Sequence, residues 1–199
     1  MLHNLTQNDI DKIQIDEGIV VVDFEETTQK VLGPTRGGAE CTITPSIRDI
    51  EFDGRKGKTK GLQVKDAEDA NLKVTALCCS QEMLAMGLAG SVVGSDSAKT
   101  ISPSAFGLLP GSAYLKNIAI ITAMLDGTFK ILVIYNPMHE GAFTFKTASK
   151  AENEHNLELQ AHYDPLNMDT TKLYEIKDSA TNPLVTETQT TPETTPETT

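Results

Sequence analysis

The chain has 199 residues, 39% of them hydrophobic, which is enough for one domain with its own core plus an appendage. Its formal net charge is −11, with seven acids and two bases in residues 1–30 and ten acids and two bases in residues 151–199. This balance argues against a free DNA-binding protein, which would carry a basic face. No run reaches the roughly 18 apolar residues that span a bilayer. Residues 1–9 lack the features of a secretion signal, so we expect synthesis and folding in a cytoplasm.

Strand patterns dominate the first part of the chain. Residues 19–24 form a β-branched run that predicts a strand, and residues 41–44 predict another, which Pro45 breaks or bulges. Residues 47–52 predict a short strand that runs into a turn. Residues 71–77 alternate apolar and polar side chains, which is typical of a half-buried strand.

The second part contains one expected helix and the strongest strand pair. Ser80 can cap a helix that runs to about Leu88. Residues 114–125 and 128–135 are apolar on both faces, and Asp126-Gly127 between them predicts a two-residue hairpin turn. We therefore expect a central hairpin that is covered on both sides. Two further strands are expected at residues 141–148 and 156–163.

Together these patterns predict a mainly β fold, either a β-sandwich or a partly closed barrel, with one flanking α-helix. We expect an N-terminal arm over residues 1–16, the β domain over residues 17–178 and a disordered tail over residues 179–199. The tail is rich in Thr, Pro and Glu, so it has almost nothing to bury.

The residue pattern does not indicate catalysis or ligand binding. The adjacent Cys78 and Cys79 are more typical of small buried side chains than of a vicinal disulfide or metal pair. Residues 33–38 lack the Gly-Lys-Ser/Thr ending of a phosphate loop. The histidines stand at no zinc-motif spacing: His3, His139, His155 and His162. We therefore expect no enzyme, no cofactor and no metal.

Concentrated positive charge occurs in one loop, at Arg55, Lys56, Lys58, Lys60 and Lys65. Three interpretations stay open: a solvated hairpin loop, a nucleic-acid contact, or a contact with the acidic surface of a second identical chain. The nucleic-acid interpretation is weak because no aromatic residues are interleaved with the bases. Copies of an acidic protein repel one another, so their contacts should bring these bases against the abundant acids.

Several segments in this order resemble the major tail tube proteins of long-tailed bacteriophages. They are Asp16-Glu17-Gly18, residues 32–40 (Leu-Gly-Pro-Thr-Arg-Gly-Gly-Ala-Glu), residues 47–54 (Ile-Arg-Asp-Ile-Glu-Phe-Asp-Gly), residues 58–62 (Lys-Thr-Lys-Gly-Leu) and residues 160–164 (Gln-Ala-His-Tyr-Asp). The resemblance covers residues 16–178. No single segment is specific, and the ordered set carries the resemblance.

The resemblance implies a virion protein, made in the host cytoplasm, whose copies form hexameric rings that stack head to tail. Inner-sheet strands of six subunits would join around an acidic lumen through which DNA passes without specific binding. Implied partners are other copies and the tail-tip, tape-measure and tail-terminator proteins. Residues 1–16 and the loop over residues 53–66 would make contacts between rings. The contact candidates are Asp53, Gly54, Arg55, Lys56, Lys58, Lys60 and Lys65, and the lumen candidates are Glu158, Gln160 and His162.

Two alternatives stay open. One is the tube subunit of a contractile injection system, which shares the implied fold. The other is a non-assembling β-sandwich binding module, for instance one that binds carbohydrate. The absence of tryptophan and an aromatic content of 5% argue against a sugar-binding platform, which needs exposed aromatic rings.

Overall fold

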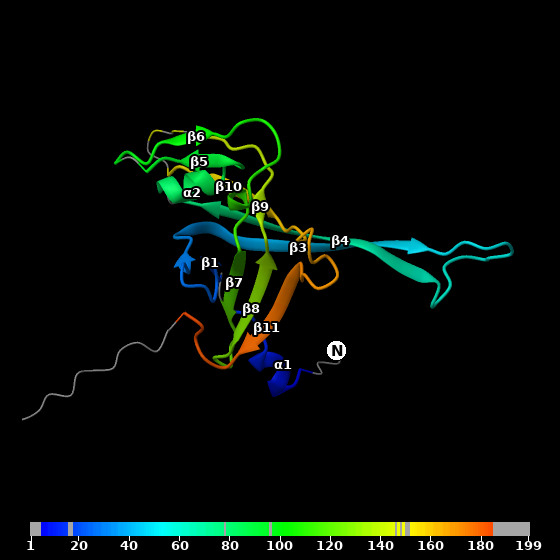
Figure 1. Cartoon of the computed structure of the whole chain (residues 1–199). Helices are drawn as coiled ribbons and strands as arrows, with labels where there is room; N and C mark the ends of the chain where they lie inside the picture. Colours follow the sequence, from blue (N-terminus) through cyan, green and yellow to red (C-terminus); the bar gives the residue numbers. More distant parts are fainter. Residues whose placement is uncertain are drawn as a thin grey trace, which may run out of the picture.

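Two antiparallel sheets supply most of the core in the computed structural model, which describes residues 5–15, 18–77, 79–95, 97–145, 147, 149 and 152–184 (Figure 1). The five-stranded sheet has the order β11-β8-β7-β1-β2, and the four-stranded sheet has the order β3-β4-β10-β9. Strands make up 41% of the structure and helices 8%, so the mainly β prediction is confirmed. No sheet in the described residues closes into a barrel, because the outermost strands of each sheet stay unpaired on one side.

The five-stranded sheet consists of β1 (Ile19–Val22), β2 (Lys30–Val31), β7 (Asn117–Ala123), β8 (Phe129–Tyr135) and β11 (Tyr174–Ser179). The four-stranded sheet consists of β3 (Thr35–Asp49), β4 (Gln63–Ala76), β9 (Met138–His139) and β10 (His155–Gln160). A small hairpin joins β5 (Ser91–Val93) to β6 (Ile101–Pro103). The helices are α1 (Gln7–Asp11), α2 (Gln81–Met86) and the 3-10 turn η1 (Gly111–Ala113).

The predicted hairpin of β7 and β8 lies near the centre of the molecule, and both of its faces are covered. Ile118 and Ile134 point into the main core, which they share with Leu72 and Leu157 of the other sheet. On the opposite face, alternate residues of β7 and β8 form a second buried cluster around Val133. Apolar side chains on both faces therefore explain the uninterrupted hydrophobic runs of these strands.

The turn of this hairpin differs from the predicted one. The Met124 N–H donates to the Thr128 carbonyl (2.8 Å), so three residues form the loop: Leu125, Asp126 and Gly127. The Gly127 N–H donates to the Met124 carbonyl (3.0 Å), and Gly127 has φ +81°. A turn followed by a left-handed glycine is the usual three-residue hairpin loop, and it uses the same Asp-Gly pair as a two-residue loop.

A single long hairpin of β3 and β4 replaces the two short strands predicted around Pro45. The strand continues through Pro45 because β3 lies at the edge of the sheet and is paired only with β4. Proline has no backbone N–H, and on the unpaired side of an edge strand no ladder hydrogen bond is lost. The ladder absorbs two irregularities, at Gly37-Gly38 in β3 and at Asp66 in β4. Its outer half, residues 44–69, leaves the body of the molecule and is called the arm below (Figure 1).

The predicted helix is present as α2, and its cap is the expected one. The Ser80 hydroxyl accepts a hydrogen bond from the Met83 N–H (3.2 Å), and Met83 is buried in the core. A second helix, α1, was not predicted because it has only five residues and buries none of them. It is stabilised by a capping box between Thr6 and Asp9.

Other strands were missed or misplaced. No strand forms in the described part of residues 141–148; instead Phe143 and Phe145 place their rings 5.9 and 6.0 Å from the ring of His155. Short strands with few signal residues were not expected: β2, β5, β6, β9 and β11. Of the predicted domain division, residues 1–4, 16–17 and 185–199 lie outside the described residues.

The N-terminal segment is held against the β7–β8 turn by a group of contacts that we call the clasp. The Leu125 N–H donates to the Ile13 carbonyl (2.9 Å), and the Ile15 N–H donates to the Ala123 carbonyl (3.2 Å). The Lys12 ammonium lies 2.7 Å from the Asp126 carboxylate. Hydrogen bonds from Lys12 and then from Thr128 lower the pKa of Asp126 below its usual value.

Acidification should open the clasp. Because the pKa of Asp126 is lower with the clasp closed, the pair stabilises the closed form above about pH 4 and loses this contribution as the pH falls below the ordinary aspartate pKa of about 3.9. Hydrogen exchange of the Leu125 amide should therefore accelerate, relative to Ile120, between about pH 5 and pH 2.5 after correction for intrinsic rates. In the Asp126→Asn variant, the Leu125 amide should exchange fast over the whole pH range. If its exchange in that variant kept the pH dependence of the unmodified protein, the role given to Asp126 would be contradicted.

Candidate assembly surface

The predicted contact residues gather at the end of the arm. Six of the seven lie in the loop between β3 and β4, residues 50–62, which we call the tip loop, and Lys65 lies in β4. The Ile50 N–H donates to the Leu62 carbonyl (2.8 Å) and closes the base of the tip loop. Asp53 and Gly54 are exposed at its outer turn, where Gly54 has φ +86°. The arm therefore presents the candidates away from the body of the subunit.

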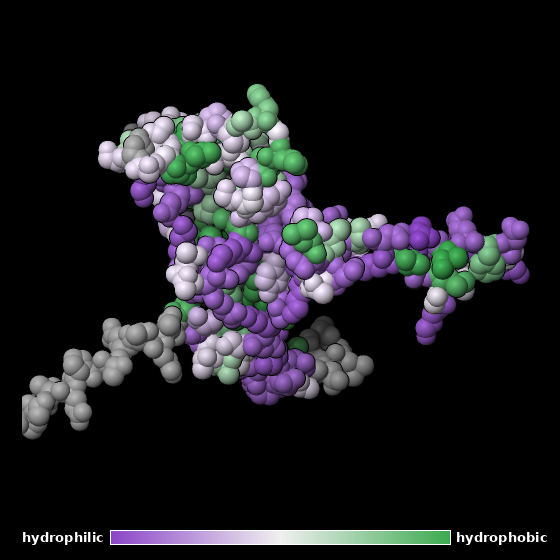
Figure 2. Space-filling view, in the orientation of Figure 1, coloured by the Kyte–Doolittle hydropathy of each residue, from purple (hydrophilic) through white to green (hydrophobic). Residues whose placement is uncertain are grey.

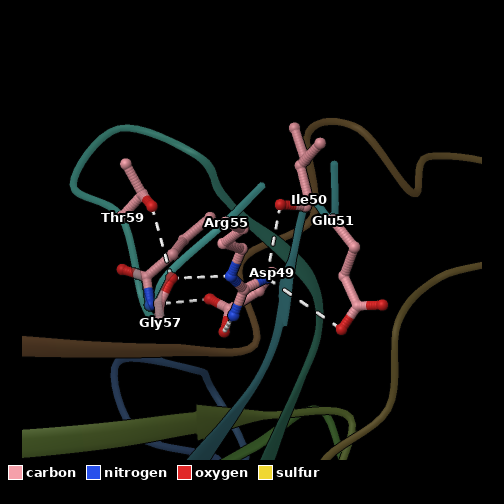
Figure 3. A network of polar contacts seen from close by, with 7 residues as sticks. Asp49, Ile50, Glu51, Arg55, Gly57 and Thr59 are labelled. Atoms are coloured by element: carbon pink, nitrogen blue, oxygen red, sulfur yellow. Dashed lines mark hydrogen bonds and ion pairs between the residues drawn. The ribbon is translucent and has the colours of Figure 1, made fainter. Parts of the chain in front are cut away.

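Arg55 organises the tip loop from within (Figure 3). Its Nε donates to the Gly57 carbonyl (2.6 Å), its Nη1 to the Ile50 carbonyl (3.3 Å) and its Nη2 to the Asp49 carboxylate (3.0 Å). Its side chain is only 17% exposed. Gly57 has φ +136°, which side-chain-bearing residues rarely adopt, and this turns its carbonyl toward the guanidinium. Arg55 is therefore a structural residue of the loop.

The Asp49 carboxylate is the partner of Arg55 at the end of β3. The Gln63 side chain donates to the other oxygen of Asp49 (3.0 Å). This hydrogen bond, together with the charge of Arg55, lowers the pKa of Asp49. Since Gln63 begins β4, the Asp49 group ties both strands of the hairpin to the loop between them.

Unpaired positive charge is confined to three of the predicted bases. Lys65 lies 2.6 Å from Glu68 on the same strand, so its charge is balanced within the arm. Lys56, Lys58 and Lys60 are exposed and form no ion pair within the described residues. These three lysines are positive charges that the tip loop can offer to another molecule, and the same loop also exposes the carboxylates of Glu51 and Asp53.

Apolar side chains accompany the lysines. Ile47 is 57% exposed, Ile50 is 42% exposed and Phe52 is 53% exposed. Figure 2 shows hydrophobic surface on the arm, set among polar residues. We call Ile47, Ile50, Phe52, Lys56, Lys58 and Lys60 the tip surface. Reading residues 47–52 as a strand concealed this feature, although the run contains three large apolar residues within six positions.

The lumen candidates lie on or near the polar face of the four-stranded sheet. Glu158 of β10 is opposite Lys73 of β4, with 3.2 Å between their charged groups, and Lys73 is in turn opposite Glu40 of β3. Gln160 accepts a hydrogen bond from Asn71 (3.2 Å) in the next row. The row of Glu40, Lys73 and Glu158 thus carries one base between two acids.

His162 stands just beyond the end of β10 rather than within the sheet. Its Nε2 lies 3.0 Å from a carboxylate oxygen of Glu140, and its Nδ1 lies 3.2 Å from the Asn136 carbonyl. The side chain is 27% exposed. The structure therefore brings Glu158 and Gln160 together on one sheet face and places His162 at its margin.

The described residues contain no cluster of three potential metal ligands, and no helix among them is long and apolar enough to cross a membrane. His155 is buried between apolar rings, and His139 accepts a hydrogen bond from the Glu158 N–H (3.0 Å). A groove of about 490 Å³ beside β6 is lined by apolar and serine side chains, with Phe106 at its rim. His3 and Cys78 lie outside the described residues.

Removing the Arg55 side chain should loosen the tip loop without unfolding the subunit. Arg55→Ala should speed exchange of the Ile50 and Leu62 amides about tenfold, because a hydrogen bond to a charged group contributes about 1.5 kcal/mol. The unfolding midpoint measured by circular dichroism should be nearly unchanged. Lys60→Ala, an exposed residue of the same loop, is the matched control. Equal exchange in the two variants would contradict the role given to Arg55.

Two comparisons with known proteins identify no relative of this chain. A scan against protein-family models finds no match, and a search of curated proteins finds no similar sequence. The resemblance to tail tube proteins stays a prediction from the sequence, and the proposal of a function depends on the geometry of the arm and of the sheet faces.

Proposed function

We propose that the protein is a structural subunit of a bacteriophage tail tube, in which copies form hexameric rings that stack into a hollow tube. The observation that carries the proposal is the arm: a long hairpin that leaves the body and ends in exposed apolar and cationic side chains. A subunit built for chemistry would concentrate such features around a pocket. This one places them where only another molecule can cover them.

Covering the exposed apolar side chains of the tip surface with a partner would remove them from water, which favours association. Phe52 is 53% exposed, so covering it completely would remove about half of an aromatic side chain's area from water, roughly 100 Å². A specific interface buries about 1,200–2,000 Å² in total, so the arm can supply only part of one. Ring and stack contacts together would supply the rest, which makes assembly cooperative.

A second copy of the chain is the partner that the charges favour. The chain carries −11 overall, so its own surface offers many carboxylates to Lys56, Lys58 and Lys60. Opposite charges across an interface select the partner and its orientation. In this proposal the lysines of one copy meet a different surface of the next copy, and such head-to-tail contacts generate rings or open stacks rather than closed dimers.

The open edges of the four-stranded sheet support side-by-side association in a ring. β3 is unpaired on its outer side, and the short β9 ends the other side of the sheet. Joining such edges between copies removes exposed backbone groups and closes a barrel around a lumen. The hexameric number and the tail-tip, tape-measure and tail-terminator partners come from the sequence resemblance.

The polar face of the same sheet suits a DNA channel. Glu40 and Glu158 flank Lys73, which leaves the row net negative. A negative lining repels phosphates, so DNA slides past without specific binding. In this proposal Glu158 and Gln160 face the lumen, and the protein resides in the virion tail. A tube within a contractile injection system fits the same surfaces.

A non-assembling binding module is the second candidate. Phe106 and Leu108 are fully exposed next to the apolar groove, and such side chains are typical of a binding surface. If this candidate is correct, the protein stays monomeric at every concentration and the lysines of the tip loop have no effect on its state.

Removing the three unpaired lysines tests the proposal. The triple variant Lys56→Ser, Lys58→Ser and Lys60→Ser should raise the protein concentration needed for sedimentable assemblies about tenfold, since three exposed pairs at about 0.5 kcal/mol each amount to one order of magnitude. Arg55 is left in place so that the loop keeps its shape.

The matched control changes three exposed lysines of the body, Lys99, Lys116 and Lys172, to serine, which gives the same net charge. It should assemble like the unmodified protein. Equal effects of the two triple variants would show a general charge effect, and no effect of either would contradict a role for the tip loop.

A further inference from the structure

His162 lies where two connections between the sheets meet. Strand β8 of the five-stranded sheet ends at Tyr135, and after Asn136 and Pro137 the chain enters β9 of the four-stranded sheet (Figure 1). The chain returns to the five-stranded sheet after β10, through residues 161–173. The His162 N–H donates to the Tyr135 carbonyl (3.4 Å), and the Asn136 side chain donates to the His162 carbonyl (3.2 Å). His162 therefore ties the return connection to the outgoing one.

Each ring nitrogen of His162 faces a hydrogen-bond acceptor. Nδ1 lies 3.2 Å from the Asn136 carbonyl oxygen, and Nε2 lies 3.0 Å from a carboxylate oxygen of Glu140. A neutral imidazole has one N–H and one lone pair, whereas the protonated ring has two N–H donors. In either neutral tautomer, a lone pair of the ring would face the carbonyl or the carboxylate. One extra proton, shared by the ring and Glu140, satisfies both contacts.

The two acceptors are held in place by backbone bonds that do not involve the ring. The Asn136 N–H donates to the Lys116 carbonyl (3.0 Å), and Asn136 has φ +47°, a left-handed conformation that few residues other than glycine adopt. The Glu140 N–H donates to the Glu158 carbonyl (3.2 Å). The Glu140 side chain is 54% exposed, so it is the acceptor that can turn into solvent when the extra proton is absent.

Glu140 is the charged group that contacts the imidazole. Tyr114 places its ring edge-on to the imidazole, with 5.1 Å between the ring centroids. Asp164, on the same connection as His162, accepts its hydrogen bonds within its own turn. Two lysines near these groups are already paired with acids: Lys73 with Glu158 (3.2 Å) and Lys116 with Glu26 (2.7 Å). The proton shared with Glu140 therefore controls the contacts of the ring.

The return connection has little burial of its own. Ala161 and Leu173 are buried at its two ends, but Leu166 and Met168 between them are exposed. Apolar side chains that stay in water do not hold a segment against the body of the protein. The hydrogen bonds at the start of the connection therefore determine how often it opens.

We propose that His162 and Glu140 form a pH-sensitive latch on the two connections. With the extra proton, the ring donates to acceptors on both sides of β9 and holds residues 161–173 in place. Without it, Glu140 is released and the latch keeps one of its two contacts. The latch therefore contributes its full stability at low pH and loses part of it as the pH rises above about 6.5, where imidazoles ordinarily lose their charge. All of its groups lie within one subunit, so the latch is independent of the proposed tube function.

Amide exchange of the unmodified protein tests the latch. The His162 N–H is bonded to the Tyr135 carbonyl, so its exchange reports opening where the two connections meet. Relative to the Ile120 amide, and after correction for intrinsic rates, it should become about fivefold faster between about pH 5.5 and about pH 8, because a partly exposed, charge-assisted hydrogen bond is lost. The ¹⁵N shifts of the ring should show two protonated nitrogens at about pH 5.5. A neutral ring at that pH, or an exchange ratio that does not change with pH, overturns the proposal.

Replacing Glu140 by its amide separates the charge from the contact. In Glu140→Gln the side-chain amide can donate to Nε2 while the neutral ring donates from Nδ1 to the Asn136 carbonyl, so both contacts form without an extra proton. The His162 amide should then exchange at the same slow rate, relative to Ile120, at both pH values.

The matched control is Asp169→Asn, which changes an exposed acid further along the same connection. It should keep the pH dependence of the unmodified protein. If Glu140→Gln kept that dependence as well, or if Asp169→Asn lost it, the assignment of the latch to Glu140 would be wrong.

Discussion

The ladder between β3 and β4 is the interaction on which the other features depend. It runs from the pair of Thr35 and Ala76 to the pair of Asp49 and Gln63, and its inner and outer halves have different structural roles. The inner half places Leu72 and Val74 in the core and fixes the register of β10 beside it. The outer half continues the same backbone pairing without a covering layer. A rigid core thus extends directly into the arm, and the arm carries the tip surface at a defined place relative to the body.

Parts of this fold follow from local sequence signals. The Asp126-Gly127 pair between two apolar runs predicts the central hairpin, and Ser80 predicts the start of α2. Local sequence signals gave the wrong structure where the position of a residue in the folded sheet determines its conformation. Pro45 is typical of a strand end, but β3 continues through it because the residue lies at a sheet edge. The short α1 has a cap and no apolar face, so periodicity could not find it.

The position of the candidate site could be predicted from the sequence, but the roles of its individual residues could not. The concentration of bases indicates the tip loop, yet nothing in the sequence separates Arg55 from its neighbouring lysines. That distinction depends on the Gly57 and Asp49 groups that the loop brings around the guanidinium. The clasp could not be predicted from the sequence for a similar reason. Lys12 and Asp126 are 114 residues apart in the chain, and their contact aligns the apolar residues on either side.

Assembly rather than catalysis is the central claim, and electron microscopy of the concentrated protein tests it most directly. Two-dimensional averages should show six-fold rings and hollow tubes. In the tubes, density for the arm should cross from each ring to the next. A strictly monomeric particle at high concentration, with and without added salt, would contradict the account.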